Sequence, residues 1–312
     1  MRILFSGSGA FGLPTLKALH EQHQVVAVLT QPDQPAGRKR VLTPTPVGQW
    51  AEAQSLPVYK FPNANEPDAI AQITSHQPDA GVVIAYGQKL SEQLIAAMGK
   101  LAVNLHASLL PDYRGAAPIN WAMIDGHKQT GNSVIALAQK MDAGDVFATN
   151  VTDIDPLETM GELHDRLSEM GPELILKVLE QLQSGTLDPQ PQDYDKVTIA
   201  RKLKKADGVI EDWSQSATQL RQRIHGLNPW PSITVQWHAQ ADDQPTPLKI
   251  LRVKDLPNVT HDKQPGTVLK DMTIATGSGA LELLEVQPAG KRPMSFSDFQ
   301  RGNNMQPGDR LE

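Results

Sequence analysis

The sequence predicts an α/β fold, in which a domain with a mainly parallel sheet precedes a smaller all-β domain of barrel or sandwich type. Short apolar runs alternate with helical patterns through residues 1–182, which is typical of βαβ units. Periodicity then stops in a stretch rich in Gly, Pro and acidic residues. Beyond residue 209, short strand-like runs recur between Gly, Pro and Asp, as in small barrels and sandwiches.

The first domain begins with a buried strand at residues 2–6, which a glycine-rich turn connects to leucines at helical spacing. A helix is expected to start at Thr159, because its hydroxyl and Glu162 match a capping box, and Pro172 is expected to kink or restart it. The other expected elements are strands at 25–29, 82–84 and 101–105, and helices at 67–75 and 91–98.

The length of 312 residues and the change in composition indicate two domains. We place the first domain at residues 1–188, a linker at 189–208 and the second domain at 209–312. The core of the second domain is expected to hold Trp213, Trp230 and Trp237. Its expected strands cover residues 233–237, 248–253, 267–269, 273–275 and 281–286.

The composition excludes several classes of function. The chain has no cysteine, so it holds no disulfide, thiolate nucleophile, iron–sulfur cluster or cysteine-bound zinc. His20 and His23 do not form the H-E-x-x-H pattern, and no metal site is predicted. No apolar run reaches the roughly 18 residues that cross a bilayer, and no signal-peptide pattern is present. We therefore expect a cytoplasmic protein that does not bind a membrane.

The net charge of -6 is unevenly distributed along the chain. Residues 1–200 carry a net charge of -8, and residues 201–312 carry +2. An acidic body with a more basic tail is compatible with binding of nucleic acid through a local patch. Taken alone, each basic cluster is more often a solvated surface. The clusters are Arg38, Lys39 and Arg40, and Arg201, Lys202, Lys204 and Lys205.

The turn at residues 7–12 matches the G-x-G-x-x-G pattern of dinucleotide sites, between a strand and a helix. That pattern also needs an acidic residue at the end of the second strand to hold a ribose, and Gln31 stands there instead. Asp33 follows, but it lies close to the basic residues 38–40. We therefore interpret the glycines as packing residues and expect no binding of NAD.

Asn104 and His106 lie at positions i and i+2, on one face at the end of an apolar strand. Ligands of open α/β sheets bind at the carboxyl ends of strands, where such side chains stabilise an oxyanion or move a proton. Asp142 ends the next apolar segment, and its carboxylate is suited to orient and polarise the imidazole.

These residues belong to a set of spaced motifs that resembles the 10-formyltetrahydrofolate-dependent formyltransferase family. The motifs are Asn104-x-His106-x-Ser108-Leu109-Leu110-Pro111, Tyr113-Arg114-Gly115, Thr130-Gly131 and Met141-Asp142-x-Gly144. Further motifs extend the resemblance over almost the whole chain to the members that formylate methionyl-tRNA. They include residues 31–33, 35–38, 228–231, 265–267 and 287–291.

The resemblance implies an enzyme with a Rossmann-like catalytic domain and an OB-fold-like domain that binds tRNA. It implies transfer of a formyl group from 10-formyltetrahydrofolate, as co-substrate, to the amino group of methionyl initiator tRNA, for initiation of protein synthesis. No protein partner is evident. It places Asn104, His106 and Asp142 at catalytic positions and Ser108, Leu109, Leu110 and Pro111 in a folate loop.

The family resemblance also places Arg38 and its neighbours in a loop that enters the tRNA acceptor stem, and we assign the cations at 201–205 to tRNA as well. The chain departs from the family at Gly7-Ser8-Gly9, where Gly-Thr-Pro is usual, and at Ala107, where Gly is usual. Neither departure touches a residue assigned to chemistry.

Three other functions are compatible with parts of the sequence. A related enzyme could formylate glycinamide ribonucleotide or an amino sugar nucleotide, but the C-terminal domain, residues 38–40 and the motif at 228–231 argue against these acceptors. The interpretation as a nicotinamide-dependent oxidoreductase rests on residues 7–12 alone. A non-catalytic RNA-binding module leaves Asn104, His106 and Asp142 without a role.

Overall fold

The computed structural model describes residues 1–37, 40–240 and 244–312. The chain forms two compact units, which we call the sheet unit and the barrel unit. The sheet unit comprises Met1–Gly115, Gly131–Thr152 and His164–Ile199, and the barrel unit comprises Ala116–Thr130, Asp153–Leu163 and Ala200–Glu312. Two segments that precede residue 164 therefore pack with the C-terminal part of the chain. The domain division at residues 188 and 208 stays a prediction.

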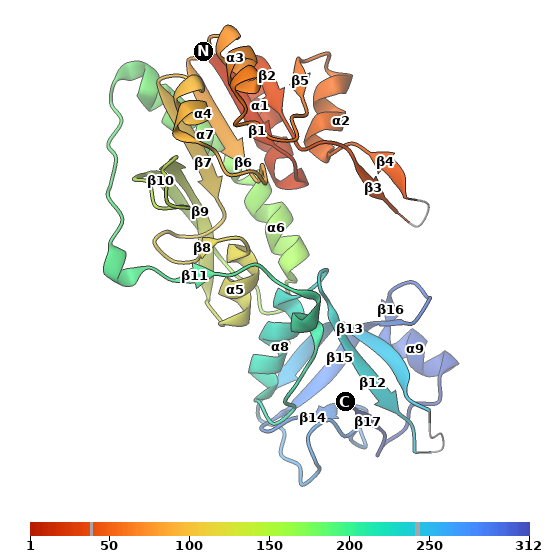
Figure 1. The fold of residues 1–312 in the computed structure, drawn as a ribbon. Helices are drawn as coiled ribbons and strands as arrows, with labels where there is room; N and C mark the ends of the chain where they lie inside the picture. The colour runs from red at the N-terminus through yellow and green to blue at the C-terminus, as the bar shows by residue number, and fades with distance from the viewer. Residues whose placement is uncertain (38–39, 241–243) are drawn as a thin grey trace. The chain divides into compact units, whose positions relative to one another are not determined.

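The sheet unit is built on a seven-stranded sheet with the order β10-β9-β7-β6-β1-β2-β5 (Figure 1). β1 (Arg2–Gly7) pairs in parallel with both β2 (Gln24–Leu29) and β6 (Ala80–Ile84). β6 and β7 are also parallel, whereas β9 runs antiparallel to β7. The predicted mainly parallel sheet is thus confirmed. The remaining strands are β5 (Val58–Tyr59), β7 (Leu101–His106), β9 (Gln129–Ala136) and β10 (Val146–Asp153), of which β5 and β10 form the edges of the sheet.

Helices bury both faces of this sheet. Leu4 lies in one apolar cluster with Ile73 of α3 and Leu94 of α4, while the neighbouring Ile3 and Phe5 point to the other face. α1 packs against α7. The helices that lie wholly in the unit are α1 (Leu13–Gln22), α2 (Pro46–Ala53), α3 (Pro67–Ser75), α4 (Glu92–Ala97) and α7 (Gly171–Ser184).

The connections follow the local signals of the sequence. Glu162 Oε2 accepts hydrogen bonds from the backbone N and the hydroxyl of Thr159, immediately before α6 (Met160–Glu169). α7 starts at Gly171 with Pro172 in its first turn, so the expected restart is confirmed. Two short antiparallel strands, β3 (Gln34–Ala36) and β4 (Val41–Thr43), form a hairpin, and β8 (Arg114–Gly115) pairs with β11 (Ile199–Ala200).

The barrel unit contains an antiparallel sheet with the order β14-β15-β13-β12-β17 and with β16 paired to β15. Thr267 bridges Arg310 of β17, and Val268 bridges Ile274 of β14, so this segment joins the two edges of the sheet. The expected barrel-like fold is therefore confirmed. The strands are β12 (Ile233–His238), β13 (Thr246–Leu256), β14 (Ile274–Ala275), β15 (Ala280–Pro288), β16 (Met294–Ser295) and β17 (Arg310–Leu311).

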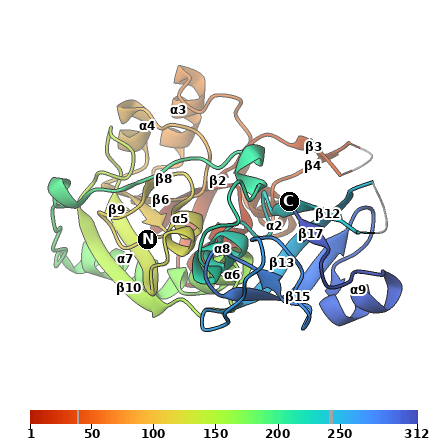
Figure 2. The ribbon, with the colours of Figure 1, turned by 90° about the horizontal axis from the view of Figure 1, so that it is seen from below.

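The helices α8 (Ala217–Gly226), α5 (Pro118–Ile124) and α9 (Phe296–Gly302) complete the barrel unit. α8 lies over β13 and β15 and packs against α5 (Figure 2). Trp213 and Trp237 are buried in the core as expected. The expectation is wrong for Trp230, which is 53% exposed because the short turn at the end of α8 directs it out of the core. Across the described ranges, no helix has the length and apolarity needed to span a membrane.

His225 of α8 is a fully buried titratable group in the barrel unit. Its Nε2 accepts a hydrogen bond from the backbone N of Val253 on β13. Burial, together with the charges of Arg221 and Arg252, lowers the pKa of His225 to about 4. The folded chain therefore keeps this ring neutral at pH values where the unfolded chain protonates it.

This difference predicts a loss of stability at mildly acidic pH. Below the unfolded pKa of about 6.5 the unfolded state binds a proton at His225 that the folded state excludes until about pH 4. Lowering the pH from 7.5 to 5 should cost about 2 kcal/mol of unfolding free energy from this residue. Urea unfolding of wild type and His225→Gln at both pH values measures it, since glutamine keeps an acceptor without titrating. His238→Gln, on a more exposed histidine, is the control. An unchanged pH dependence in His225→Gln would contradict the assignment.

Candidate active site

His106 is the last residue of β7 and is buried, with 6% of its side chain exposed. Its Nε2 lies 2.8 Å from the carbonyl oxygen of Tyr113. Because a carbonyl only accepts, Nε2 must carry a proton and donate it. The other ring nitrogen, Nδ1, faces Oδ2 of Asp142 at 3.6 Å. Nδ1 is therefore the ring nitrogen that faces the carboxylate.

Asp142 lies in the loop between β9 and β10 and has a left-handed backbone, with φ of 53°. Its Oδ2 accepts a hydrogen bond from the backbone N of Gly115 at 2.9 Å, and its Oδ1 lies 3.4 Å from the amide nitrogen of Asn104. Gly144 permits this loop, because a Cβ there would lie 1.9 Å from the carbonyl oxygen of Ala136. The carboxylate is thus aimed at the end of β7.

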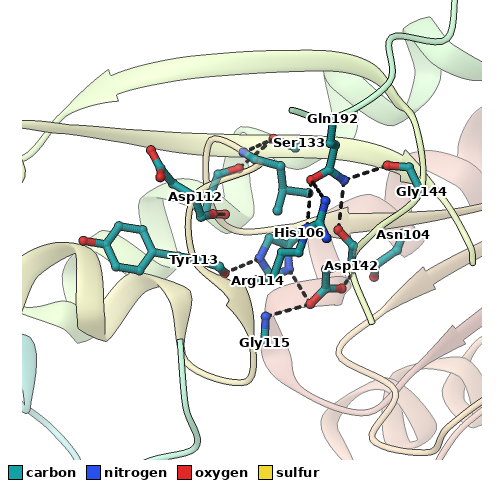
Figure 3. A network of polar contacts seen from close by, with 12 residues as sticks. Asn104, His106, Asp112, Tyr113, Arg114, Gly115, Ser133, Asp142, Gly144 and Gln192 are labelled. Carbon is teal, nitrogen blue, oxygen red and sulfur yellow. Dashed lines mark hydrogen bonds and ion pairs between the residues drawn. The ribbon is translucent and has the colours of Figure 1, made fainter. Parts of the chain in front are cut away.

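The structure brings the three predicted catalytic side chains together (Figure 3). Asn104 and His106 come from one face of β7, as the i, i+2 spacing predicts, and Asp142 reaches them from a separate loop. An amide donor, a buried imidazole and a carboxylate in one cluster are suited to stabilise an oxyanion and accept a proton.

The loop at Ser108–Pro111 follows β7 directly. Ser108 Oγ donates a hydrogen bond to the carbonyl of Asp112 at 2.6 Å. Ser133 Oγ donates to the carbonyl of Ser108 at 2.7 Å and accepts from the backbone N of Leu110 at 3.1 Å. Ser108 is buried, whereas Leu109, Leu110 and Pro111 are half-buried. Ser133 fixes this loop, and no sequence pattern had singled it out.

The first predicted cation cluster is only partly described. Arg38 and Lys39 lie outside the described residues. Arg40 is exposed beside the β3–β4 hairpin, with a left-handed φ of 50°. Its backbone N donates a hydrogen bond to the carbonyl of Gly37. Arg40 thus lies between β3 and β4, immediately before the first residue of β4.

The second cluster consists of four exposed cations, of which Arg201 is held in an ion pair. Arg201 forms an ion pair with Asp207 at 2.5 Å and lies 4.6 Å from the ring centroid of Trp121. The hydrogen bond from Arg201 is the main cause that lowers the pKa of Asp207 to about 2. Leu203 is buried in the barrel core and anchors the segment. The exposed cations around it are Lys202, Lys204 and Lys205.

The two sets of predicted residues lie in different units. The Asn104–His106–Asp142 cluster and the Ser108–Pro111 loop belong to the sheet unit, and the cations at 201–205 belong to the barrel unit. Among the residues that the structure describes, no group of three or more His, Asp or Glu side chains is arranged to hold a metal ion.

Two family models match the chain. The model "Formyl transferase" matches residues 1–179, and "Formyl transferase, C-terminal domain" matches residues 202–304. A methionyl-tRNA formyltransferase of Roseiflexus castenholzii is 38% identical over 316 residues, covering 100% of this chain and 99% of the relative. One of Symbiobacterium thermophilum is 40% identical over 317 residues, covering 100% of this chain and 95% of the relative.

The chain belongs to the methionyl-tRNA formyltransferase family. The resemblance stated from the sequence motifs is therefore confirmed, and the protein is a formyl-group transferase. The second matched model and both relatives extend beyond the motifs at the active site into the barrel unit.

Solved structures support the fold at lower identity. An N-formyltransferase from Helicobacter canadensis, in complex with folinic acid and dTDP-3-aminofucose, has a TM-score of 0.66 at 12% identity, covering 94% of this chain and 100% of that one. HypX from Aquifex aeolicus, in complex with tetrahydrofolic acid, has a TM-score of 0.63 at 15% identity, covering 96% of this chain and 46% of that one. At these identities the comparison establishes the architecture.

The glycine-rich turn of this family member has a packing role. A Cβ at Gly7 would lie 2.8 Å from the carbonyl oxygen of Ile84, whereas a Cβ at Gly9 would meet only the Cβ of Ala85 at 3.9 Å. Ser8 Oγ donates to the carbonyl of Tyr86 at 2.9 Å and accepts from the backbone N of Gln31 at 3.1 Å. Ser8 thus joins the segments after β2 and β6.

This geometry predicts different outcomes at the two glycines. Gly7→Ala should destabilise the fold by about 2 kcal/mol, because the methyl group meets backbone in a packed region. Gly9→Ala should change stability by less than about 0.5 kcal/mol and leave turnover within a factor of about two, since φ at Gly9 is -74° and the space is open. Thermal unfolding and turnover assays of both variants test this. A folded but inactive Gly9→Ala protein would indicate that a ligand approaches the turn closely, as a dinucleotide does.

Proposed function

We propose that Asn104, His106 and Asp142 catalyse transfer of a formyl group from 10-formyltetrahydrofolate to the amino group of methionyl initiator tRNA. The observation that carries this proposal is the convergence of these three side chains at the carboxyl end of β7. Relatives along the whole chain are named methionyl-tRNA formyltransferases, which supports the acceptor. Because the acceptor is a tRNA of translation initiation, we place the enzyme in the cytoplasm.

The reaction makes two demands on the site. The neutral amino group attacks the formyl carbon on N10 of the folate, and the formyl oxygen becomes an oxyanion in the tetrahedral intermediate. The Asn104 amide and a protonated Nδ1 of His106 donate hydrogen bonds to this oxygen, since Nε2 is already engaged with Tyr113. The Asp142 carboxylate accepts the proton that the attacking amine loses. When the C–N10 bond breaks, N10 takes the proton that Asp142 received from the amine, so the carboxylate is regenerated and tetrahydrofolate leaves.

The Ser108–Pro111 loop is suited to contact the folate. It follows His106 directly, so a ligand on this loop places its reactive carbon near the catalytic cluster. Leu109, Leu110 and Pro111 are half-buried and offer apolar surface for a flat ring. Ser133 holds the loop from β9 by two hydrogen bonds.

The tRNA binds through the exposed cations that the sequence singled out, Lys202, Lys204 and Lys205 together with the cluster at residues 38–40. An exposed lysine binds a phosphate as a mobile point charge and releases a counterion from it. Arg201 is paired with Asp207 and lies against Trp121. It therefore stabilises the conformation of the segment and adds less to the charge available for phosphate.

We expect each of the single variants Asn104→Ala, His106→Ala and Asp142→Ala to lower kcat by about 100-fold or more while the protein stays folded. Each substitution removes an oxyanion donor or the proton acceptor, and loss of one oxyanion donor costs about 10²–10³ in kcat. The assay measures formylation of methionyl initiator tRNA by 10-formyltetrahydrofolate, with elongator methionyl-tRNA and free methionine as acceptor controls. Wild-type kcat in any one variant removes that residue from the mechanism.

A second prediction concerns the lysines of the barrel unit. The triple variant Lys202→Gln, Lys204→Gln and Lys205→Gln should raise the KM for tRNA and leave the KM for the folate unchanged. The slope of log K against log salt should also become shallower, by roughly one for each phosphate that the enzyme no longer binds. The matched control changes the exposed Lys263, Lys270 and Lys291 to Gln, which alters net charge equally. Equal effects in the two triple variants would argue for net charge alone and against a phosphate site at this segment.

A further inference from the structure

The linker between α7 and the barrel unit lies against the active-site loops. It leaves α7 and continues to β11 (Figure 1). Gln190 forms an antiparallel bridge with Val146 at the start of β10, and Thr198 bonds the segment before β8. We call residues 190–198 the linker strap. All of its residues belong to the sheet unit, as do both loops that it contacts.

Gln192 is the buried residue of the linker strap, with 7% of its surface exposed. Its Nε2 donates hydrogen bonds to the carbonyls of Asp142, at 2.9 Å, and Gly144, at 2.7 Å. Its Oε1 accepts from Nε and Nη2 of Arg114, at 3.0 and 2.8 Å. One amide therefore ties the backbone of the Asp142 loop to the segment that contains Gly115, the donor to the Asp142 carboxylate (Figure 3).

Thr198 acts on the histidine side of the site. Its Oγ1 accepts a hydrogen bond from the backbone N of Tyr113 at 2.8 Å, and its carbonyl accepts from the backbone N of Arg114 at 3.0 Å. Tyr113 has a left-handed φ of 59°, and its carbonyl accepts from Nε2 of His106. Thr198 thus fixes the peptide that holds the His106 ring.

Neither loop has enough regular structure to hold these atoms by itself. Asp142 and Tyr113 both adopt left-handed backbone conformations that cost energy for residues other than glycine, so external contacts must stabilise them. A catalytic group works only when its geometry is held to within roughly half an ångström. The linker strap supplies the hydrogen bonds at both places.

We infer that Gln192 and Thr198 are positioning residues for formyl transfer. Through them the linker strap sets the distance and orientation of the Asp142 carboxylate with respect to the His106 ring. This inference rests on the proposed function of His106 and Asp142. It gives the linker a role in the chemical step in addition to its connection of the two units.

The test at Gln192 compares Gln192→Met with Gln190→Met. Both change an amide to a thioether in the same linker, but Gln190 is exposed and its amide contacts only the carbonyl of Asp188. Gln192→Met should lower kcat by about 10- to 100-fold with KM for folate and tRNA nearly unchanged, and Gln190→Met should match wild type. Gln192→Glu keeps an acceptor for Arg114 but loses both donors, so it should be as impaired. Recovery of kcat in Gln192→Glu would overturn positioning through the Asp142 loop.

The test at Thr198 compares Thr198→Val with Thr198→Ser. Serine keeps the hydroxyl that accepts from Tyr113 and should restore most of the kcat that valine removes. The second readout is the pair of ring ¹⁵N shifts of His106, assigned with His106→Ala. These shifts should move in Gln192→Met and Thr198→Val and stay in Gln190→Met and Thr198→Ser. Wild-type ring shifts together with wild-type kcat in Gln192→Met and Thr198→Val would overturn the inference.

The failure of the inference is distinguishable from failure of the proposed function. His106→Ala is assayed beside the linker variants. A large loss of kcat in His106→Ala, with wild-type kcat in Gln192→Met and Thr198→Val, refutes the positioning role of the linker strap and leaves the proposed function standing. Wild-type kcat in His106→Ala refutes the proposed function, and the ¹⁵N shifts then still decide whether the linker strap sets the geometry of the His106 ring.

Discussion

The hydrogen-bonded Asp142 carboxylate is the interaction on which the candidate site depends. Its side chain is 13% exposed, so protein groups must replace most of the water that an ionised carboxylate needs. The backbone N of Gly115 and the amide of Asn104 do so, and the His106 ring lies on the same side. Since these groups come from β7 and β8, one carboxylate fixes two separate segments with respect to each other.

Local patterns determined the parts of the structure that were predicted well. α3 covers residues 67–75 as expected, and β1 and β7 match their predicted strands within one residue. The placement of Asn104 and His106 followed from the same reasoning, because a strand's two-residue period puts them on one face whatever surrounds it. Asp142 needed the family motif in addition, since nothing local specifies that a loop 36 residues beyond His106 returns to β7.

Residues whose roles depend on partners distant in sequence were missed. Ser133 and Gln192 act on backbone groups 23 to 50 residues away, and neither stands in a pattern that announces a ligand or a catalyst. The assembly of each unit from separate chain segments was missed for the same reason. α5 packs against α8, which lies about 100 residues later. Trp230 was misplaced because its aromatic character favours a core, whereas its position after α8 exposes it.

Formal charge gives an incomplete description of the cations that a protein surface offers to a ligand. Three arginines of the barrel unit are held in ion pairs, Arg201 with Asp207, Arg221 with Asp255 and Arg252 with Glu162. A planar guanidinium suits such fixed partners, whereas an exposed ammonium keeps its mobility and its full charge. The net charge of +2 over residues 201–312 therefore understates the local concentration of available cations at Lys202, Lys204 and Lys205. These lysines lie four to seven residues beyond the linker strap. The proposed positioning of the catalytic loops and the proposed binding of phosphate therefore belong to neighbouring segments of one connection.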